Sequence, residues 1–367
     1  MPGKAAMPAF LYSKLKFTGE LMSVFTIIGA GMMGSAMSFP LRDNGHEVRI
    51  VGTPLDVEIV EQLKVDNYHK NMKRTLPEGI TFHQIGDLEK AIAGTDFFIG
   101  GVSSFGVEWF ADYVIPRLPE KAVVLSITKG LRETEEGIPE TFPEYLMRRD
   151  VKGTISFNAV GGPCTSYELA DRRHTCVTFC GKDYDTLCAL RKCLAVEYYH
   201  ISCSTDIRGV ETAVAMKNVY AAAVSTAIGA NELIVGMGGQ EKYNPQAGLF
   251  GESVREIGKL LKIMGGDPDA IMLAAGDLYV TVFGGRTRKL GVLLGRGLSY
   301  ENAKEILAGV TLESVAIAQA MSNSLRKLAA AGRADLKDFP LLLALDATIH
   351  HGAKLDIPWE KFILDRP

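Results

Sequence analysis

The chain has 367 residues, of which 47% are hydrophobic and 23% charged, the balance of an ordinary globular protein long enough for two domains. A net charge of −3 provides no basic surface for nucleic acid or anionic lipid, and no apolar run reaches the ~20 residues that span a bilayer, so we expect neither a nucleic-acid partner nor a membrane span. The cysteines include no C-x-x-C pair, so we expect no metal site and a reducing, cytoplasmic compartment, and residues 1–23 resemble an N-terminal extension rather than a secretory signal.

A glycine-rich turn follows the first apolar segment, 24–28, and precedes a helical segment over 35–43. In a strand–turn–helix unit, the first glycine permits a tight turn, the second lets the backbone approach a pyrophosphate, and the third lets the helix pack against the strand. A second apolar strand over 48–51 completes the expected βαβ unit. An ordinary glycine turn is the alternative, but this placement favours a dinucleotide site. The predicted cofactor contacts here are Gly29, Gly31, Met32, Met33 and Gly34.

The end of the second strand bears on the choice between NAD and NADP. An acidic side chain about 20 residues after the glycine turn would hold the ribose of NAD. Here the strand ends in Gly52-Thr53, and Asp56 comes too late for that role. We therefore expect Thr53 near the cofactor and NADP accepted at least as well as NAD. The candidate cations for a 2′-phosphate are Arg49 and the pair Lys73-Arg74.

Apolar strand candidates alternate with helical segments as far as residue 203. This alternation predicts a Rossmann-type, doubly wound, mainly parallel sheet covered by helices, in a dinucleotide-binding domain over residues 24–205. Ligands bind at the carboxyl ends of such strands, which makes Ser103 and Lys129 candidate site residues. The candidates are strands over 96–102, 122–127, 154–160, 175–179 and 196–201, and a helix over 105–118.

The pattern changes near residue 206, beyond which alanine, leucine, glycine and methionine recur at helical spacing. We expect residues 206–367 to form an all-α C-terminal domain that carries the substrate site. Such helical domains often supply dimer contacts, so a homodimer is the expected assembly. The expected helices are 209–228, 244–264, 268–274, 300–308, 312–330 and 339–350.

Lys217 is the most informative polar residue of the helical half, because it lies on an apolar stripe with Val210, Val214 and Ala221. A lysine on a core-facing stripe is costly to bury unless it is paired, and burial lowers the pKa of a lysine toward the range that suits proton transfer. The alternative is a lysine at the edge of the stripe with its head in solvent. The adjoining Asn218 would bind a ligand or cap a neighbouring helix.

Two further segments carry polar groups in suggestive patterns. Asp277 and Thr281 are four residues apart and would share one face of a helix. The glycines and cations of 284–289 follow at once, a composition that suits a grip on phosphate or carboxylate, or alternatively an exposed basic turn. Gly162 lies in a Gly-Gly-Pro turn after a strand, which by itself indicates only a loop near a strand end.

Taken together, residues 24–325 resemble the NAD(P)-dependent glycerol-3-phosphate dehydrogenases. Lys-Asn in the first helix of a helical domain and a later G-D-L-x-x-T-x-x-G-G-R run are more specific than the nucleotide turn alone. The resemblance implies reversible hydride transfer from NAD or NADP to a small phosphorylated substrate, dihydroxyacetone phosphate, within glycerophospholipid metabolism. The matching stretches are Gly29 to Gly34, Thr128-Lys129-Gly130-Leu131, Gly162-Pro163 with Glu168, Glu211 with Lys217-Asn218, Gly276-Asp277-Leu278 with Thr281, and Gly284-Gly285-Arg286.

The resemblance also implies catalytic roles. Lys217 would be the general acid and base at the C2 oxygen, and Lys129 would hold the substrate and polarise its carbonyl. Asp277 and Thr281 would complete the lysine network. The two ammonium groups would then meet beside the nicotinamide, where electrostatic stabilisation of the developing alkoxide matters most.

The implied binding contacts come from both halves of the chain. Arg286 would hold the phosphate with help from Asn218, and it would also contact the cofactor, as would Lys129. Glu313 resembles a cofactor contact of the family's later E-G-x-x-T-A segment. The remaining substrate contacts implied are Thr287 and Gly162.

The sequence departs from the family pattern at the expected substrate pocket. Thr287 stands where the family has asparagine after the arginine, and Cys164-Thr165 replaces a small-aromatic pair. A dehydrogenase of the same fold acting on another small polyol or keto phosphate is therefore the leading alternative. A nucleotide-binding sensor without enzymatic activity is the second alternative.

Overall fold

The computed structural model describes residues 22–309 and 312–362, so nearly all of the predicted N-terminal extension lies outside the described residues. Within them the chain divides into two compact units. Unit 1 comprises residues 22–129 and 142–207, and unit 2 comprises residues 130–141 together with the described residues from 208 onward. No helix in the described part of the chain combines the length and apolar character needed to cross a membrane.

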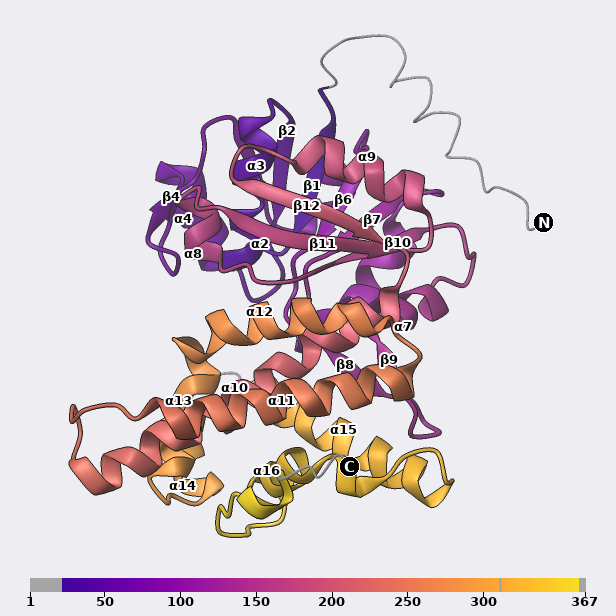
Figure 1. The fold of residues 1–367 in the computed structure, drawn as a ribbon. Helices are drawn as coiled ribbons and strands as arrows, with labels where there is room; N and C mark the ends of the chain where they lie inside the picture. Colours follow the sequence, from indigo (N-terminus) through magenta and orange to yellow (C-terminus); the bar gives the residue numbers. More distant parts are fainter. Residues whose placement is uncertain (1–21, 310–311, 363–367) are drawn as a thin grey trace. The chain divides into compact units, whose positions relative to one another are not determined.

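Unit 1 is built on an eight-stranded sheet in the order β12-β11-β10-β7-β6-β1-β2-β5 (Figure 1). Neighbouring strands are parallel except for the antiparallel pair β10 and β11. The predicted Rossmann-type parallel sheet is therefore confirmed. Its strands are β1 (Val24–Ile28), β2 (Glu47–Val51), β5 (Ile80–His83), β6 (Phe97–Gly100), β7 (Val123–Ser126), β10 (Ser156–Gly161), β11 (Thr175–Gly181) and β12 (Tyr199–Ser204).

Helices cover both faces of this sheet. Successive side chains of a strand point to opposite sides, and here the apolar side chains on both sides are buried. Ile27 of β1 packs into one hydrophobic core and the next residue, Ile28, packs into another. Both side chains are fully buried. The α-helices of unit 1 are α2 (Met32–Ala36), α3 (Ser38–Asp43), α4 (Val57–Asp66), α5 (Leu88–Ile92), α6 (Val107–Trp109), α7 (Phe142–Arg149), α8 (Ser166–Ala170) and α9 (Tyr184–Leu194).

Three predicted elements of unit 1 differ in the structure. The helix expected over 35–43 is interrupted at Met37, because Pro40 has no N–H to donate to the carbonyl four residues earlier. The helix expected over 105–118 is a series of short turns that ends at Ile115–Arg117, with Pro116 acting in the same way. The last strand begins at Tyr199 rather than 196, because a tight turn closes from Tyr199 N–H to the Val196 carbonyl at 3.0 Å.

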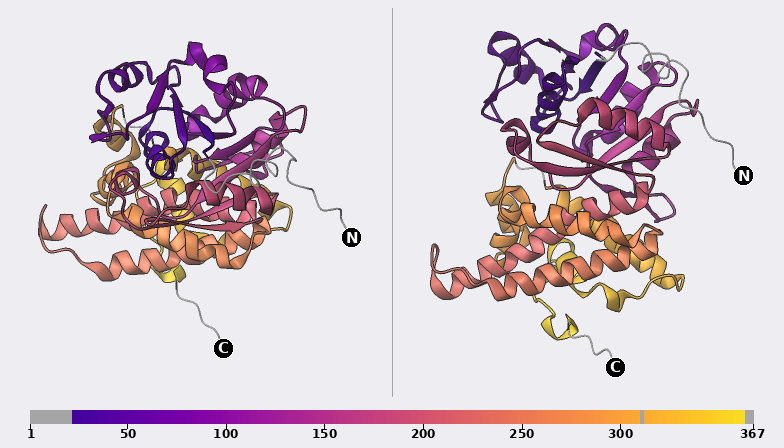
Figure 2. Two further views of the ribbon diagram at one scale, coloured as in Figure 1. Left: turned by 90° about the horizontal axis from the view of Figure 1, so that it is seen from above. Right: turned by 45° about the horizontal axis from the view of Figure 1, so that its top comes forward.

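Unit 2 is a bundle of helices around one core (Figure 2). Its longest helix, α10, has 29 residues, and α13 packs closely against it. A Cβ at Gly291 or Gly295 of α13 would lie within 2.2 Å of a carbonyl oxygen of α10, so glycine is required at this crossing. The helices are α10 (Ile207–Val235), α11 (Tyr243–Met264), α12 (Ile271–Val282), α13 (Gly285–Gly295), α14 (Tyr300–Ile306), α15 (Glu313–Ala330) and α16 (Pro340–His350).

A short hairpin of β8 (Leu131–Glu133) and β9 (Pro139–Thr141) also belongs to unit 2. Leu131 packs into the helical core, and Lys327 of α15 donates to Glu133 at 2.6 Å. This hairpin is not apparent from the sequence, because strands of three residues are too short to show a period of two. Unit 1 holds a similar pair of two-residue strands, β3 (Tyr68–His69) and β4 (Arg74–Thr75), which is also too short to be apparent from the sequence.

A buried carboxylate, Glu256 of α11, ties three helices of unit 2 together. It accepts hydrogen bonds from the Tyr220 hydroxyl at 2.7 Å and from the backbone N–H groups of Leu341 and Leu342 at 2.6 and 3.0 Å. Burial raises the pKa of Glu256 from about 4.5 to about 8, Glu252 acts in the same direction, and the three donors act against it.

Glu256 therefore predicts a pH dependence of stability. Because its folded pKa is raised, its contribution to the free energy of unfolding is complete below pH 4.5 and is lost as the pH rises toward about 8. Urea unfolding of the wild type and of Glu256→Gln between pH 5 and 9 measures this contribution as the difference between the two. We expect the difference to decrease with rising pH. A difference that stays constant from pH 5 to 9 would mean that the three donors keep the folded pKa near or below 4.5, so that the carboxylate is ionised throughout this range.

Candidate functional site

The glycine turn of unit 1 has distinct requirements at its three glycines. Gly29 adopts φ +117°, and a Cβ there would lie 2.4 Å from the Gly101 carbonyl oxygen. A Cβ at Gly34 would lie 2.3 Å from the Gly29 oxygen. Gly31, by contrast, has no protein atom within 4 Å of the position a Cβ would take. Two glycines are thus needed for packing, and the third faces open space of the kind that a pyrophosphate requires.

The residues beside this turn differ in exposure. Met32 is 37% exposed, and its sulfur accepts a hydrogen bond from the Tyr167 hydroxyl at 3.4 Å, whereas Met33 is half-buried and packs against the core. Gly31 caps α2 without a side-chain hydrogen bond. The turn therefore presents backbone rather than ionised side chains to a ligand, as a phosphate cradle does.

Asp56 links the end of β2 to the glycine turn. Its Oδ2 accepts hydrogen bonds from Ala30 N–H at 3.1 Å, from Thr53 N–H at 2.9 Å and from the Thr53 hydroxyl at 2.8 Å. The sequence position of Asp56 argued only against a role in holding the ribose of NAD and did not indicate this contact with the glycine turn. A Thr-x-x-Asp spacing that permits these local hydrogen bonds is the signal that could have revealed it.

Two cations named for a 2′-phosphate have other partners. Arg49 donates to the carbonyls of Ala91 and Ala93 at 2.9 and 2.7 Å, and Arg74 forms a bidentate pair with Asp171 at 2.6 and 2.8 Å. Both side chains therefore already have strong partners inside unit 1. Lys73 remains the candidate of the original three for a nucleotide phosphate.

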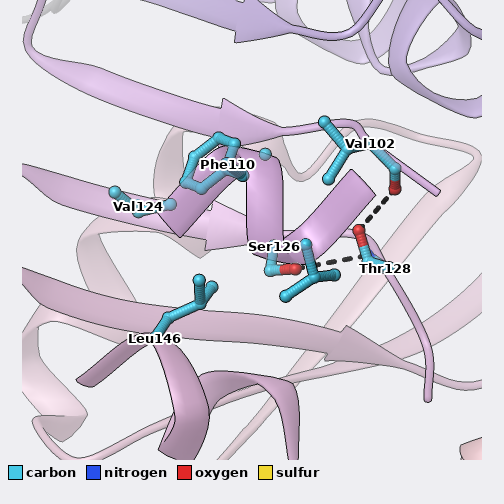
Figure 3. Close-up of a pocket in the computed structure, with 8 residues that line it drawn as sticks. Val102, Phe110, Val124, Ser126, Thr128 and Leu146 are labelled. Atoms are coloured by element: carbon cyan, nitrogen blue, oxygen red, sulfur yellow. Dashed lines mark hydrogen bonds between the residues drawn. The ribbon is translucent and has the colours of Figure 1, made fainter. Parts of the chain in front are cut away.

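The carboxyl ends of the neighbouring strands hold three more predicted residues. Lys129 follows β7 and donates from Nζ to the Gly162 carbonyl at 2.6 Å, so these two residues lie together. Ser103 is exposed and begins the short turn after β6. Figure 3 shows a mostly apolar pocket near these ends, where the Thr128 hydroxyl donates to the Val102 carbonyl at 2.6 Å. Its lining suits packing more than recognition of a polar substrate.

In unit 2, Lys217 of α10 and Asp277 of α12 form an ion pair. The Lys217 side chain is 13% exposed and the Asp277 side chain is fully buried. The Thr281 hydroxyl donates to the Asp277 carbonyl at 2.6 Å, one helical turn back. Removing either charge would break a buried ion pair, which is strongly unfavourable. Lys217, which its spacing places on an apolar stripe, thus pairs with a buried carboxylate and does not extend its ammonium group into solvent.

The same two helices border a polar pocket of about 470 Å³ that is open to solvent. It brings together candidate residues from three separate segments, and both the cationic Arg286 and the anionic Glu313 line it. A guanidinium among hydroxyl, amide and glycine groups is an arrangement that accepts a phosphate. The lining residues are Asn218, Thr281, Gly284, Gly285, Arg286, Thr287 and Glu313.

Two family models match this chain in adjoining regions. The model described as NAD-dependent glycerol-3-phosphate dehydrogenase N-terminus matches residues 24–187. The model described as NAD-dependent glycerol-3-phosphate dehydrogenase C-terminus matches residues 206–359. The first region contains the glycine turn and Lys129, and the second contains the ion pair and the polar pocket.

Individual relatives agree with the family models. The chain is 33% identical over 286 residues to the NADP(+)-dependent glycerol-3-phosphate dehydrogenase of Archaeoglobus fulgidus, covering 77% of this chain and 83% of that protein. It is 28% identical over 341 residues to the NAD(P)+ glycerol-3-phosphate dehydrogenase of Streptococcus pneumoniae, covering 90% and 92%. A glycerol-3-phosphate dehydrogenase structure from Plasmodium falciparum has the same fold, with a TM-score of 0.80, 19% identity and coverage of 97% and 99%.

Proposed function

The chain belongs to the NAD-dependent glycerol-3-phosphate dehydrogenase family, and from this premise we propose that it reversibly reduces dihydroxyacetone phosphate to sn-glycerol 3-phosphate with NADH or NADPH. The observation that carries the proposal is the buried Lys217–Asp277 pair, on the two helices that also border the Arg286 pocket. A poised proton donor next to an anion grip is what reduction of a keto phosphate needs.

Each substrate group has a proposed partner. The phosphate dianion binds Arg286, with Asn218 and Thr287 as hydrogen-bonding neighbours in the same pocket. Lys217 gives its proton to the C2 oxygen during reduction and takes it back during oxidation, while Asp277 fixes the position of the ammonium group. Thr281 completes the lysine network from one helical turn away, where its hydroxyl donates to the backbone carbonyl of Asp277.

Lys129 polarises the substrate carbonyl. Gly162 positions the lysine, because the hydrogen bond from Lys129 Nζ to the Gly162 carbonyl limits where the ammonium group can lie. A positive charge near the carbonyl oxygen stabilises the negative charge that develops there. The proposal therefore assigns proton transfer to Lys217 and electrostatic stabilisation to Lys129.

The cofactor supplies the hydride when it is bound. Gly29, Gly31 and Gly34 with Met32 and Met33 form the proposed pyrophosphate cradle, because Gly31 has the free space that a nucleotide needs. Further proposed cofactor contacts are Thr53, Ser103, Lys129, Arg286 and Glu313.

The cradle is tested by two alanine substitutions with opposite expectations. Gly31→Ala should fold with an unchanged melting temperature yet bind NADPH and NADH more weakly, because its methyl group meets no protein atom and takes space from the ligand. Gly34→Ala should lower the melting temperature, because its methyl group would overlap the Gly29 oxygen. Thermal unfolding and nucleotide titration give both results. Full nucleotide affinity in Gly31→Ala would place the pyrophosphate elsewhere.

The activity itself is tested by absorbance at 340 nm with dihydroxyacetone phosphate and each reduced cofactor in turn. A panel of other small keto phosphates belongs in the same assay, because Thr287 and Cys164-Thr165 depart from the family pattern near the expected substrate site. Faster turnover of another keto phosphate would replace the proposed substrate but keep the reaction type. Nucleotide binding without turnover of any of them would favour a sensor.

We also propose a homodimer in the cytoplasm. Apolar side chains are exposed near the end of α10, where Leu233 is 66%, Ile234 83% and Met237 79% exposed, and such a group commonly marks a protein interface. A cytoplasmic location fits an enzyme that draws on the NAD(P)H pool. Light scattering after gel filtration measures the assembly, and Ile234→Asp should shift a dimer toward the monomer.

A further inference from the structure

Ala30, inside the glycine turn, is held by buried side chains at both of its backbone polar atoms. Its N–H donates to Asp56 Oδ2 at 3.1 Å, and its carbonyl lies 2.9 Å from His69 Nε2. Asp56 is 9% exposed and His69 is fully buried. His69 Nδ1 accepts the Met72 N–H at 3.1 Å, so Nε2 carries the proton and donates to Ala30. We name Asp56 and His69 the Ala30 clamp.

The clamp holds the turn through segments distant in sequence. Asp56 follows β2 and precedes α4, and it is itself fixed by the N–H and the hydroxyl of Thr53. His69 belongs to the small β3–β4 pair. Gly29, the residue before Ala30, donates to the Val51 carbonyl at 2.8 Å. The turn is therefore ordered by hydrogen bonds within unit 1 that need no ligand.

We propose that Asp56 and His69 are positioning residues that keep the glycine turn in its pyrophosphate-accepting shape before the nucleotide arrives, and that Asp56 does not select between NAD(H) and NADP(H). The inference rests on the proposed function, since it assumes that the turn binds a nucleotide. A carboxylate that selects NAD acts by accepting the ribose hydroxyl. The Asp56 carboxylate is instead almost buried, and its Oδ2 accepts three protein donors. A rigid cradle lowers the ordering cost of binding for either nucleotide.

Direct binding tests the second half of the proposal. Asp56→Ala should weaken NADH and NADPH alike, each by about tenfold, as expected for the loss of hydrogen bonds to a charged group. Thr53→Val removes the hydroxyl that donates to Asp56. It should weaken NADH and NADPH by the same factor, and by less than Asp56→Ala does. Glu58→Ala is the control. Glu58 is exposed and lies two residues after Asp56, so the variant removes a like charge and should leave both affinities unchanged. A loss confined to NADH would make Asp56 a ribose ligand and overturn the proposal.

Hydrogen exchange without nucleotide tests the first half. Peptides covering residues 29–34 should exchange faster in Asp56→Ala and in His69→Leu than in the wild type, and His69→Gln should restore slow exchange because its amide N–H can replace Nε2–H. Unchanged exchange and affinity in the Asp56→Ala and His69→Leu variants would refute the clamp. If the wild type binds neither nucleotide, the proposed function fails first, and the exchange data still report whether the clamp orders the turn.

Discussion

Replacing Lys217 with alanine is expected to lower kcat by a factor of about 10²–10⁴, the usual contribution of a general acid or base, while NADPH and NADH bind as before. The reason is that the proposed proton for the C2 oxygen comes from this ammonium group, whereas the nucleotide cradle lies in unit 1. Steady-state turnover and nucleotide titration of the purified variant measure the two effects separately. Turnover equal to the wild type would remove Lys217 from catalysis.

The variant also leaves Asp277 buried without its cation, which costs about 3–5 kcal/mol when one partner of a buried pair is removed. The double variant Lys217→Ala with Asp277→Asn removes that charge and should recover stability while remaining inactive. Lys262→Ala, at an exposed position of α11, is the matched control and should retain full turnover. Activity in a stable double variant would show that the pair serves folding alone.

Replacing Arg286 with alanine should weaken the phosphorylated substrate far more than its unphosphorylated analogue. A charged, bidentate contact with phosphate contributes about 1.5–3 kcal/mol, so KM for dihydroxyacetone phosphate should rise by about 10- to 150-fold. Any turnover of dihydroxyacetone should change little, because that molecule has no phosphate for Arg286 to bind. Initial rates at varied concentrations of each compound give the comparison.

The control for Arg286 lies three residues further along α13. Lys289→Ala removes one positive charge from an exposed position outside the pocket, so it separates a specific contact from the general field of this basic segment. We expect Lys289→Ala to change KM by less than about twofold, as for a distant, screened surface charge. Equal weakening of both compounds by Arg286→Ala would mean that the arginine shapes the pocket rather than binding phosphate.

Thr53 shows that locating a strand end from the sequence does not identify the group to which its polar atoms bind. Its position at the end of the second strand predicts that Thr53 lies near the cofactor. The structure adds that its hydroxyl and N–H both point to Asp56, which in turn reaches Ala30 of the glycine turn. Strand ends can be located from local apolar patterns, but the partner of each polar group depends on how the intervening residues fold back.

The sequence by itself determined the elements whose signals are local: the strand–turn–helix unit at Gly29, the alternation that builds the parallel sheet, and the apolar stripe that contains Lys217. Each follows from the preferences of neighbouring residues and from a period of two or 3.6. Local patterns could not decide the remaining features, which the tertiary structure shows: Asp277 pairs directly with Lys217, a link that only the family resemblance had implied, Arg286 and Glu313 share one pocket, and the β8–β9 hairpin joins the helical unit. Those outcomes depend on contacts between residues far apart in the chain, because buried charges must find partners and short strands are stabilised by what they pack against.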